Sequence, residues 1–348
     1  MPACRTSPPH PKAELVHRSQ PLLGTFVTIS AYGPDRAATL QAISAAFEEF
    51  KRADAVMSIH RADSELARVN AGAATNAVVV SPELFAVLQL AQDIASQTDG
   101  AFDVTIRPLA DLWGFIWKQH RLPTTAELEN TLPLVNFRQV DLDPTNRTVR
   151  FRAQVTRAPL SRPSATLSPS DGERDGVRGL SIDLGGIGKG VAVDWAIEKL
   201  RLLGVTNAMV KAGGDLRVSG TPPGETYWTV QLEDPRKKGQ RANISLRDAA
   251  LSTSGNYENF FEVNGRRYSH ILNPRTGLPI EGIAACTVIA PTCAESDAWA
   301  TALFVLGVEQ SLESFGPIRA MRFTIPSPEN KTPGWRIHQS RSFPTSIP

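Results

Sequence analysis

The sequence contains very little cysteine. Its 348 residues include only Cys4, Cys286 and Cys293, an odd number of thiols at wide spacing. A disulfide framework and a zinc site built from paired cysteines both need closely organised sets of thiols, so the spacing argues against both. We therefore expect the chemistry of this chain to use other groups.

Long apolar runs and a charge excess are also missing. No run approaches the ~18 apolar residues of a membrane span. Lys plus Arg total 37 and Asp plus Glu total 35, for a net charge of +2. A nucleic-acid binder typically shows a strong basic excess, so we expect no nucleic acid partner. The first 20 residues lack the apolar core of a signal peptide, and no apolar stretch precedes Cys4, so neither export nor a lipid anchor is predicted.

The composition is that of a globular protein, because 41% of the residues are hydrophobic. At ~150 residues per domain, the length allows two domains or one large one. Residues 1–20 are Pro-rich and predict a disordered lead, and 327–348 predict a tail. Residues 154–178 are rich in Ser, Pro, Arg and Gly and predict a flexible surface insertion. One folded unit over 21–326 follows, because the strands flanking the insertion look like parts of one unit.

Periodicity predicts helices alternating with strands. Ser81 and Pro82 form a helix start, and Asn264-Gly265 favours a type I′ hairpin turn. Thr292 and Glu295 form a capping box. The expected strands are 25–32, 180–184, 260–263 and 266–269, and the expected helices include 82–98, 189–203 and 293–307.

The glycine-rich segment 183–190, Asp-Leu-Gly-Gly-Ile-Gly-Lys-Gly, joins an expected strand to an expected helix. Backbone N–H groups at such a helix start bind anions, most often phosphate. The spacing matches neither a Walker A loop nor GxGxxG, and a tight turn without a ligand would have the same glycines. A second glycine turn at 212–215 favours a close approach of the backbone to a ligand.

Three further features contain side chains suited to chemistry. Asp297 and Thr301 are four residues apart on an expected helix, so their oxygens share a face and suit Mg²⁺. An Asp that stabilises the helix dipole beside a solvent-facing Thr would give the same pattern. His270 ends a hairpin strand, where it can act as a base or serve as a structural histidine. Phe102 and Asp103 can contact a base or a hydroxyl, or simply begin a strand.

These motifs occur in a fixed order between about residues 22 and 307. They are Leu23-Gly-Thr25, Met57-Ser58 with Asp63-Ser-Glu65 and Asn70, Asp99-Gly-Ala-Phe-Asp103, 183–190, Ala212-Gly-Gly-Asp215, Ser254-Gly-Asn-Tyr257, Ser269-His270 with Pro274 and Thr276-Gly277, and Ala294 to Thr301. Each is weak alone. In this order the set resembles the ApbE-type flavin transferases, the FAD:protein FMN transferase family.

The resemblance implies a fold and an activity. The fold would be α+β, a single composite catalytic domain of mixed, largely antiparallel sheets with packed helices. The activity would be Mg²⁺-dependent transfer of the FMN half of FAD to a threonine of a target protein, with release of AMP. The partners would then be FAD and an acceptor protein carrying a threonine flavinylation motif. No copy of that motif, Asp-x-x-Ser/Thr-Gly-Ala-Thr/Ser, occurs here, so the acceptor is expected in another polypeptide.

The resemblance also implies roles for particular residues. Asp297 and Thr301 would bind the metal through side-chain oxygens, and Gly188 and Ala294 through backbone carbonyls. His270 would be the catalytic residue that activates the acceptor hydroxyl. The FAD site would consist of Leu23, His60, Ala101, Phe102, Asp103, Gly185, Val191 and Leu272.

The chain departs from the family pattern at four of these positions. Leu23 replaces the usual Met, and Gly188 replaces the common Ala, which leaves a backbone ligand unchanged. His60 replaces the usual Tyr and adds a titrating ring, while Val191 replaces a frequent aromatic residue and removes one stacking contact. Family members are often exported and anchored to the bacterial inner membrane on its periplasmic side. This chain shows no such signal, so its location stays open.

Two other functions fit the same residues. Water in place of threonine would give Mg²⁺-dependent hydrolysis of FAD to FMN and AMP. A protein that binds FAD without catalysis is the third hypothesis, against which the presence of Asp297, Thr301 and His270 argues.

Overall fold

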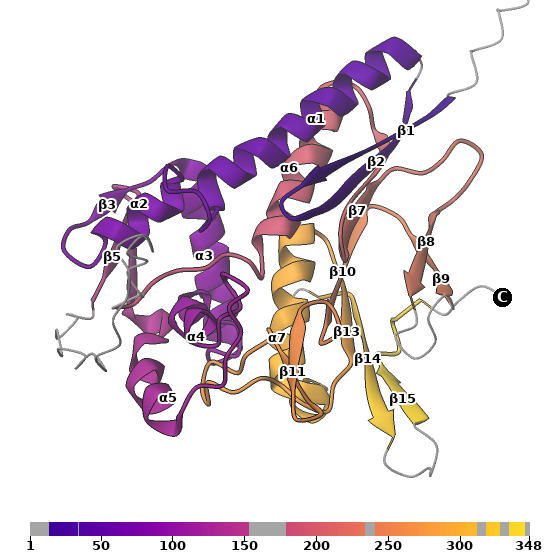
Figure 1. Cartoon of the computed structure of the whole chain (residues 1–348). Helices are drawn as coiled ribbons and strands as arrows, with labels where there is room; N and C mark the ends of the chain where they lie inside the picture. Colours follow the sequence, from indigo (N-terminus) through magenta and orange to yellow (C-terminus); the bar gives the residue numbers. More distant parts are fainter. Residues whose placement is uncertain are drawn as a thin grey trace, which may run out of the picture.

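A computed structural model describes residues 14–33, 35–152, 179–233, 241–311, 318–327 and 334–344. Residues 1–13, Cys4 among them, and the predicted insertion at 154–178 lie outside this described part. Helices and strands are numbered along the chain, as labelled in Figure 1.

The centre of the molecule is an eight-stranded sheet. Its strand order is β1-β2-β6-β7-β10-β13-β14-β15, and every described strand pair is antiparallel. The strands are β1 (Glu14–Leu22), β2 (Thr25–Gly33), β6 (Asn207–Ala212), β7 (Asp215–Ser219), β10 (Ala249–Gly255), β13 (Ala285–Ala290), β14 (Ala320–Ser327) and β15 (Gly334–Gln339). The predicted α+β fold with largely antiparallel sheets is confirmed.

Three long helices lie against this sheet: α1 (Arg36–Met57), α6 (Gly188–Leu202) and α7 (Cys293–Ser311). Figure 1 shows α1 running from the sheet toward a second group of elements on the left of the view. That group contains α2 (Glu65–Gly72), α3 (Pro82–Gln97), α4 (Arg107–Leu112), α5 (Thr125–Thr131) and a small sheet of β3 (Val78–Val79), β5 (Thr148–Phe151) and β4 (Val140–Asp143). Two two-stranded sheets, β8 (Trp228–Glu233) with β9 (Arg241–Leu246) and β11 (Phe260–Val263) with β12 (Arg266–Ser269), complete the strands of the described residues. None of the described helices combines the length and the apolar character needed to cross a membrane.

The local signals in the sequence explain several element ends. Ser81 caps α3 by accepting a hydrogen bond from the N–H of Leu84 at 3.2 Å, as predicted. Asn264 and Gly265 have φ values of 52° and 75°, which confirms the type I′ turn between β11 and β12. Thr292 and Glu295 bond reciprocally at the start of α7, so the predicted capping box is also present.

Three sequence predictions were wrong. Residues 14–20 were assigned to a disordered lead but belong to β1, which pairs with β2 along its whole length. The expected tail contains β15, paired with β14. Residues 180–184 form no strand, because the side-chain amide of Asn70 takes the place of a neighbouring strand by bonding the N–H and the carbonyl of Ile182 at 2.7 and 2.9 Å.

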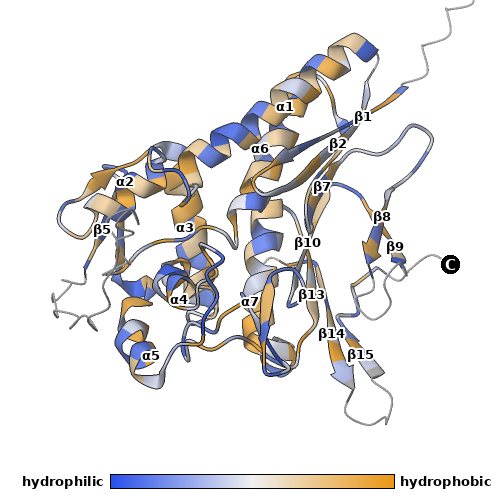
Figure 2. Cartoon of the chain, viewed as in Figure 1, coloured by the Kyte–Doolittle hydropathy of each residue, from blue (hydrophilic) through white to orange (hydrophobic). Residues whose placement is uncertain are grey.

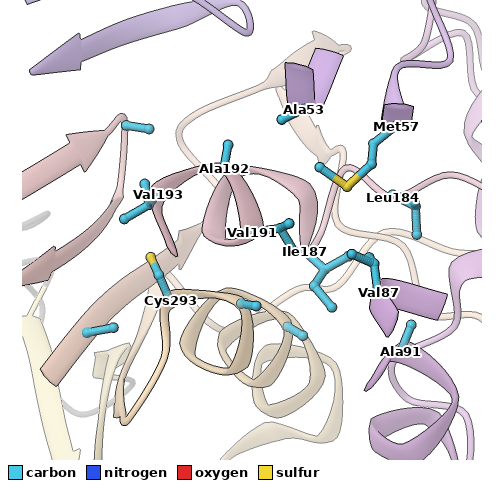
Figure 3. Packing of buried hydrophobic residues seen from close by; sticks show 14 of the residues in the cluster. Ala53, Met57, Val87, Ala91, Leu184, Ile187, Val191, Ala192, Val193 and Cys293 are labelled. Atoms are coloured by element: carbon cyan, nitrogen blue, oxygen red, sulfur yellow. The ribbon is translucent and has the colours of Figure 1, made fainter. Parts of the chain in front are cut away.

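The main core lies between the sheet and the helices α1, α3, α6 and α7. Figure 2 shows α1 alternating between hydrophilic and hydrophobic residues along its length, as expected of a helix with one buried face. In Figure 3, Val191 and Ala192 of α6 lie among Met57 of α1, Val87 of α3 and Cys293 of α7. These side chains join the two groups of elements into one hydrophobic core.

Helices α6 and α7 touch at their first turns. A side-chain carbon at Gly190 would overlap the carbonyl oxygen of Cys293 and lie 2.8 Å from the backbone nitrogen of Ala294. Both groups belong to the backbone and cannot rotate away. Gly190 therefore permits a close crossing of α6 and α7, and any larger residue at this position would push the two helices apart.

Replacing Gly190 with alanine should destabilise the protein. Overpacking of this kind costs about 1–3 kcal/mol, and here the clash is with backbone. Gly188→Ala is a matched control, because its added carbon would only reach ordinary contact with Met57 at 3.9 Å. Urea unfolding should show a clear loss of stability in G190A and little change in G188A. Equal stability of the two variants would contradict the close backbone contact between α6 and α7 at Gly190.

Candidate functional site

The glycine turn before α6 is held from both sides. The N–H of Asp183 donates to the carbonyl of Val104 at 2.7 Å, and the Asp183 carboxylate accepts from the N–H of Gly185 at 2.8 Å. A side-chain carbon at Gly186 would lie 3.2 Å from the ring of Phe102 and 3.5 Å from the hydroxyl of Thr301. The turn thus runs between Phe102 and α7, with its backbone close to the Thr301 hydroxyl.

Asp297 and Thr301 lie on the α7 face that meets this turn. The Asp297 side chain is only 6% exposed, and its Oδ2 accepts a hydrogen bond from the N–H of Gly190 at 3.0 Å. The Thr301 hydroxyl lies 3.3 Å from the hydroxyl of Ser254 at the end of β10. The structure therefore brings the two predicted side-chain oxygens to the start of α6.

A buried lysine balances the charge of this region. The ammonium of Lys189 forms an ion pair with Asp215, whose side chain is 2% exposed, and its nitrogen lies 3.6 Å from Oδ2 of Asp297. Burial and the charge of Asp215 raise the pKa of Asp297 to about 7, against the opposing effect of Lys189. Burial lowers the pKa of Lys189, but Asp215 and Asp297 outweigh it and raise that pKa above its ordinary value. The lysine therefore stays charged.

The donors at this place fit a hard cation such as Mg²⁺. They are oxygens, one carboxylate and one hydroxyl, next to the backbone of the first turns of α6 and α7, which contain Gly188 and Ala294. Within the described part of the chain, no three His, Cys, Asp or Glu side chains cluster as a metal site. Mg²⁺ is usually bound through one or two carboxylates plus substrate phosphates, so a set with one carboxylate is consistent with it.

Asp194 is a site residue that the sequence reasoning missed. Its carboxylate accepts the N–H groups of Cys293 and Ala294 at 2.9 and 2.8 Å, and it pairs with Arg217 at 2.8 Å. Burial raises its pKa although Arg217 and the two N–H groups favour the charged form. Asp194 fixes the start of α7 and thereby the direction of Asp297. The sequence signal that could have pointed to Asp194 is its charge within the otherwise apolar run that follows Gly190.

His270 is fixed by a single carbonyl group. The backbone N–H of His270 donates to the carbonyl of Asn259 at 3.0 Å, and ring Nδ1 lies 2.9 Å from the same oxygen. A carbonyl only accepts, so Nδ1 carries the proton and Nε2 of the neutral ring can take one. Burial, together with the charge of Lys189, lowers the pKa of His270. The geometry and the charge both suit a neutral base.

An aromatic cluster supports the hairpin that ends at His270. Phe261 of β11 and Tyr268 of β12 stack at 5.3 Å and pack against Trp113, whose ring lies 5.7 Å from that of Tyr268. The indole N–H of Trp113 donates to the carbonyl of Gly277 at 2.7 Å. The ring of Phe115 meets that of His270 edge-on at 6.4 Å. Leu272 is buried in this cluster.

The other predicted FAD positions lie on several separate elements. Leu23 lies at the β1–β2 turn with a φ of 50°. His60 is exposed after α1, and Ala101 is buried beside Phe102. Val191 is buried and lines a cavity of about 420 Å³. Val87, Leu90, Trp195 and Ala294 are among the other residues that line this cavity.

Asp103 has a local structural role in this arrangement. Its carboxylate accepts three hydrogen bonds, from the N–H and hydroxyl of Thr105 at 2.8 and 2.6 Å and from the N–H of Phe137 at 2.9 Å. Burial raises the pKa of Asp103 in spite of these bonds. The side chain thus holds the segment after Phe102 in place.

Comparison with known proteins gives a consistent result. The model of the ApbE family matches residues 23–320. The FAD:protein FMN transferase of Haemophilus influenzae is 34% identical over 270 residues, 76% of this chain and 72% of that protein. The protein of the same name from Treponema pallidum is 32% identical over 84% of this chain and 79% of its own length.

Solved structures of ApbE proteins are also similar to this chain. The ApbE protein of Thermotoga maritima has a TM-score of 0.77 and 28% identity, with 94% of this chain and 97% of that chain covered. The flavin transferase ApbE of Vibrio cholerae has a TM-score of 0.76 and 28% identity, with coverage of 95% and 98%.

The raised pKa of Asp297 predicts a pH-dependent cost in stability. Between the ordinary value of 3.8 and about 7, the folded protein holds a proton on Asp297 that the unfolded chain releases. Its contribution to stability is therefore largest in acid and falls as the pH rises through this window. Asp297→Asn removes the charge but leaves Lys189 and Asp215 balanced.

We expect the stability of D297N relative to wild type to increase from pH 5 to pH 8. Urea unfolding in the presence of a metal chelator measures it. A constant difference between the two proteins across this range would contradict the burial of an ionisable Asp297.

Proposed function

The chain belongs to the ApbE family, and we propose that it transfers the FMN half of FAD to a threonine of a second protein. Flavin transfer itself follows from this membership. The proposal adds a dependence on Mg²⁺, a threonine acceptor and the release of AMP. The observation that carries it is the packing of Asp297 and Thr301 against the glycine turn that begins α6.

The backbone of the glycine turn is suited to the diphosphate of FAD. Its N–H groups precede a 15-residue helix, where the helix dipole favours negative charge. Gly185 is exposed and Gly186 is partly exposed, and the N–H of Gly185 is bonded to the Asp183 carboxylate, so a ligand would meet the remaining backbone of the turn. In the proposal, FAD lies along this turn with Phe102 on one side and Thr301 on the other.

Asp297 and Thr301, with the carbonyls of Gly188 and Ala294, would hold Mg²⁺ next to this turn. When bound, Mg²⁺ neutralises phosphate charge and stabilises the AMP leaving group. Asp194 keeps the first turn of α7 in place, and Gly190 orients the Asp297 carboxylate through its N–H. The chain's own contribution is thus a rigid set of oxygens at the crossing of two helices.

His270 would remove the proton from the attacking threonine. The threonine oxygen forms a bond to the phosphorus of the FMN half while the bond from that phosphorus to the bridging oxygen breaks, and AMP leaves with that oxygen. Nε2 of His270 accepts the hydroxyl proton, because Nδ1 is held by the carbonyl of Asn259. A positioned base of this kind contributes about 10²–10⁴-fold to the rate.

A labelling assay tests this function. The protein is incubated with FAD, Mg²⁺ and candidate acceptors, and an FMN-bearing fluorescent band is sought on a denaturing gel. We expect a labelled acceptor and an equal amount of AMP. Free FMN and AMP, with every tested acceptor unlabelled, would instead indicate hydrolysis with water in place of threonine. FAD bound without any product would indicate a binding protein.

His270→Ala separates catalysis from binding. Transfer should fall by about 10²–10⁴-fold, while the dissociation constant of FAD changes little, because the ring acts on the acceptor hydroxyl. Gel analysis of samples quenched at successive times measures the transfer rate, and calorimetric titration measures the dissociation constant of FAD. Transfer at the wild-type rate would assign the base to another residue.

Asp297→Ala tests the metal. Removal of the carboxylate leaves one side-chain oxygen, so Mg²⁺-stimulated turnover should be lost while the fold is retained. Titration with Mn²⁺, followed by its electron paramagnetic resonance, should show weakened metal binding in the same variant. Full Mg²⁺-dependent activity of D297A would overturn the metal assignment.

A further inference from the structure

Trp117 has a partly solvent-exposed indole ring. Its residue is 45% exposed, whereas Trp113, Trp228 and Trp299 are buried. The ring of Trp117 meets the ring of His60 edge-on, with centroids 5.4 Å apart. Two aromatic rings from segments distant in sequence thus form a small aromatic pair that is open to solvent.

The loop that holds Trp117 is closed by its own backbone. Gln119 donates its N–H to the carbonyl of Gly114 at 3.0 Å, and Arg121 donates to the carbonyl of Trp113 at 3.2 Å. Phe115 points into the aromatic cluster below and is 6% exposed. The loop therefore has a fixed base, and both closing bonds enclose the exposed Trp117.

The position of His60 connects this pair with the glycine turn. Met57, three residues before His60, lies 3.9 Å from where a side-chain carbon on Gly188 would stand, so the segment before His60 meets the start of α6. The charged form of the His60 imidazole also lowers the pKa of Asp183 and of Asp111 of α4, each of which burial raises. Asp183 in turn bonds the N–H of Gly185 in the glycine turn. The Trp117–His60 pair hence stands beside the segment to which the diphosphate is assigned.

We propose that Trp117, together with His60, forms a stacking surface for one of the two fused aromatic rings of FAD. The inference rests on the proposed function, since it names the ligand of the same site. A flat, partly exposed ring on a fixed loop loses little conformational freedom on binding, and an aromatic ligand removes it from water. The two candidate rings are the isoalloxazine and the adenine, which share this chemistry.

Binding of FAD in Mg²⁺-free buffer, where turnover is suppressed, tests the proposal. Removal of a stacking side chain costs about 1–3 kcal/mol per base, so Trp117→Ala should weaken FAD binding roughly 5- to 150-fold. Trp117→Phe should retain most of the affinity, because it keeps a flat ring. Tyr227→Ala, which removes another exposed aromatic side chain (51%) near β8, is the matched control and should bind as wild type.

FMN and AMP, titrated separately, identify the ring. A loss of FMN affinity in W117A assigns the isoalloxazine to Trp117, and a loss of AMP affinity assigns the adenine; either result supports the proposal. Circular dichroism melting of each variant controls for folding.

Unchanged FAD affinity in a folded W117A would overturn the stacking surface while leaving flavin transfer intact. A change confined to the KM of the acceptor would also overturn it, because Trp117 would then contact the acceptor. Failure of the wild-type protein to bind FAD at all would instead remove the proposed function, and the stacking surface with it.

Discussion

The close crossing of α6 and α7 is the constraint on which the rest of the site depends. Gly190 lets the two backbones meet, and its N–H bonds the Asp297 carboxylate at 3.0 Å. The same helix provides Lys189 and Asp194, which balance Asp297 and cap α7. A small outward movement of either helix would separate Thr301 from the glycine turn. The packing of apolar residues in Figure 3 is therefore also what fixes the polar atoms of the site.

Buried charge is tolerated here because it is shared. Asp297 and Asp215 lie near one ammonium, Lys189, and Asp194 lies against Arg217. One ammonium serves two carboxylates, so burial and Asp215 still raise the pKa of Asp297 to about 7, and its charge is complete only above that pH. The group thus retains one carboxylate in excess of its lysine, an arrangement that a divalent cation with a diphosphate can complete. The near-neutral composition of the chain agrees with a ligand held by local groups, without a large basic field.

Short-range signals in the sequence predicted most local structure correctly. The caps at Ser81 and Thr292, the hairpin turn at Asn264 and the extent of α6 all depend on residues within one turn. The sequence could not predict pairings that tertiary contacts decide, such as β15 in the main sheet or the support of Ile182 by Asn70. For the candidate site, helical spacing predicted that Asp297 and Thr301 share one face of α7, and the family resemblance implied their role as metal ligands. Three further residues could not be assigned a role from the sequence, because their partners are distant in the chain. Lys189 pairs with Asp215, Asp194 bonds the N–H of Cys293, and Trp117 meets His60.

Anomalous diffraction from crystals grown with Mn²⁺ and FAD tests the central claim most directly. Mn²⁺ scatters anomalously and prefers the oxygen ligands that Mg²⁺ prefers. The account predicts one strong peak between the Asp297 carboxylate and the Thr301 hydroxyl, within reach of the Gly188 and Ala294 carbonyls, with the diphosphate of FAD along the glycine turn. A peak at another place, or FAD bound away from this turn, would contradict it.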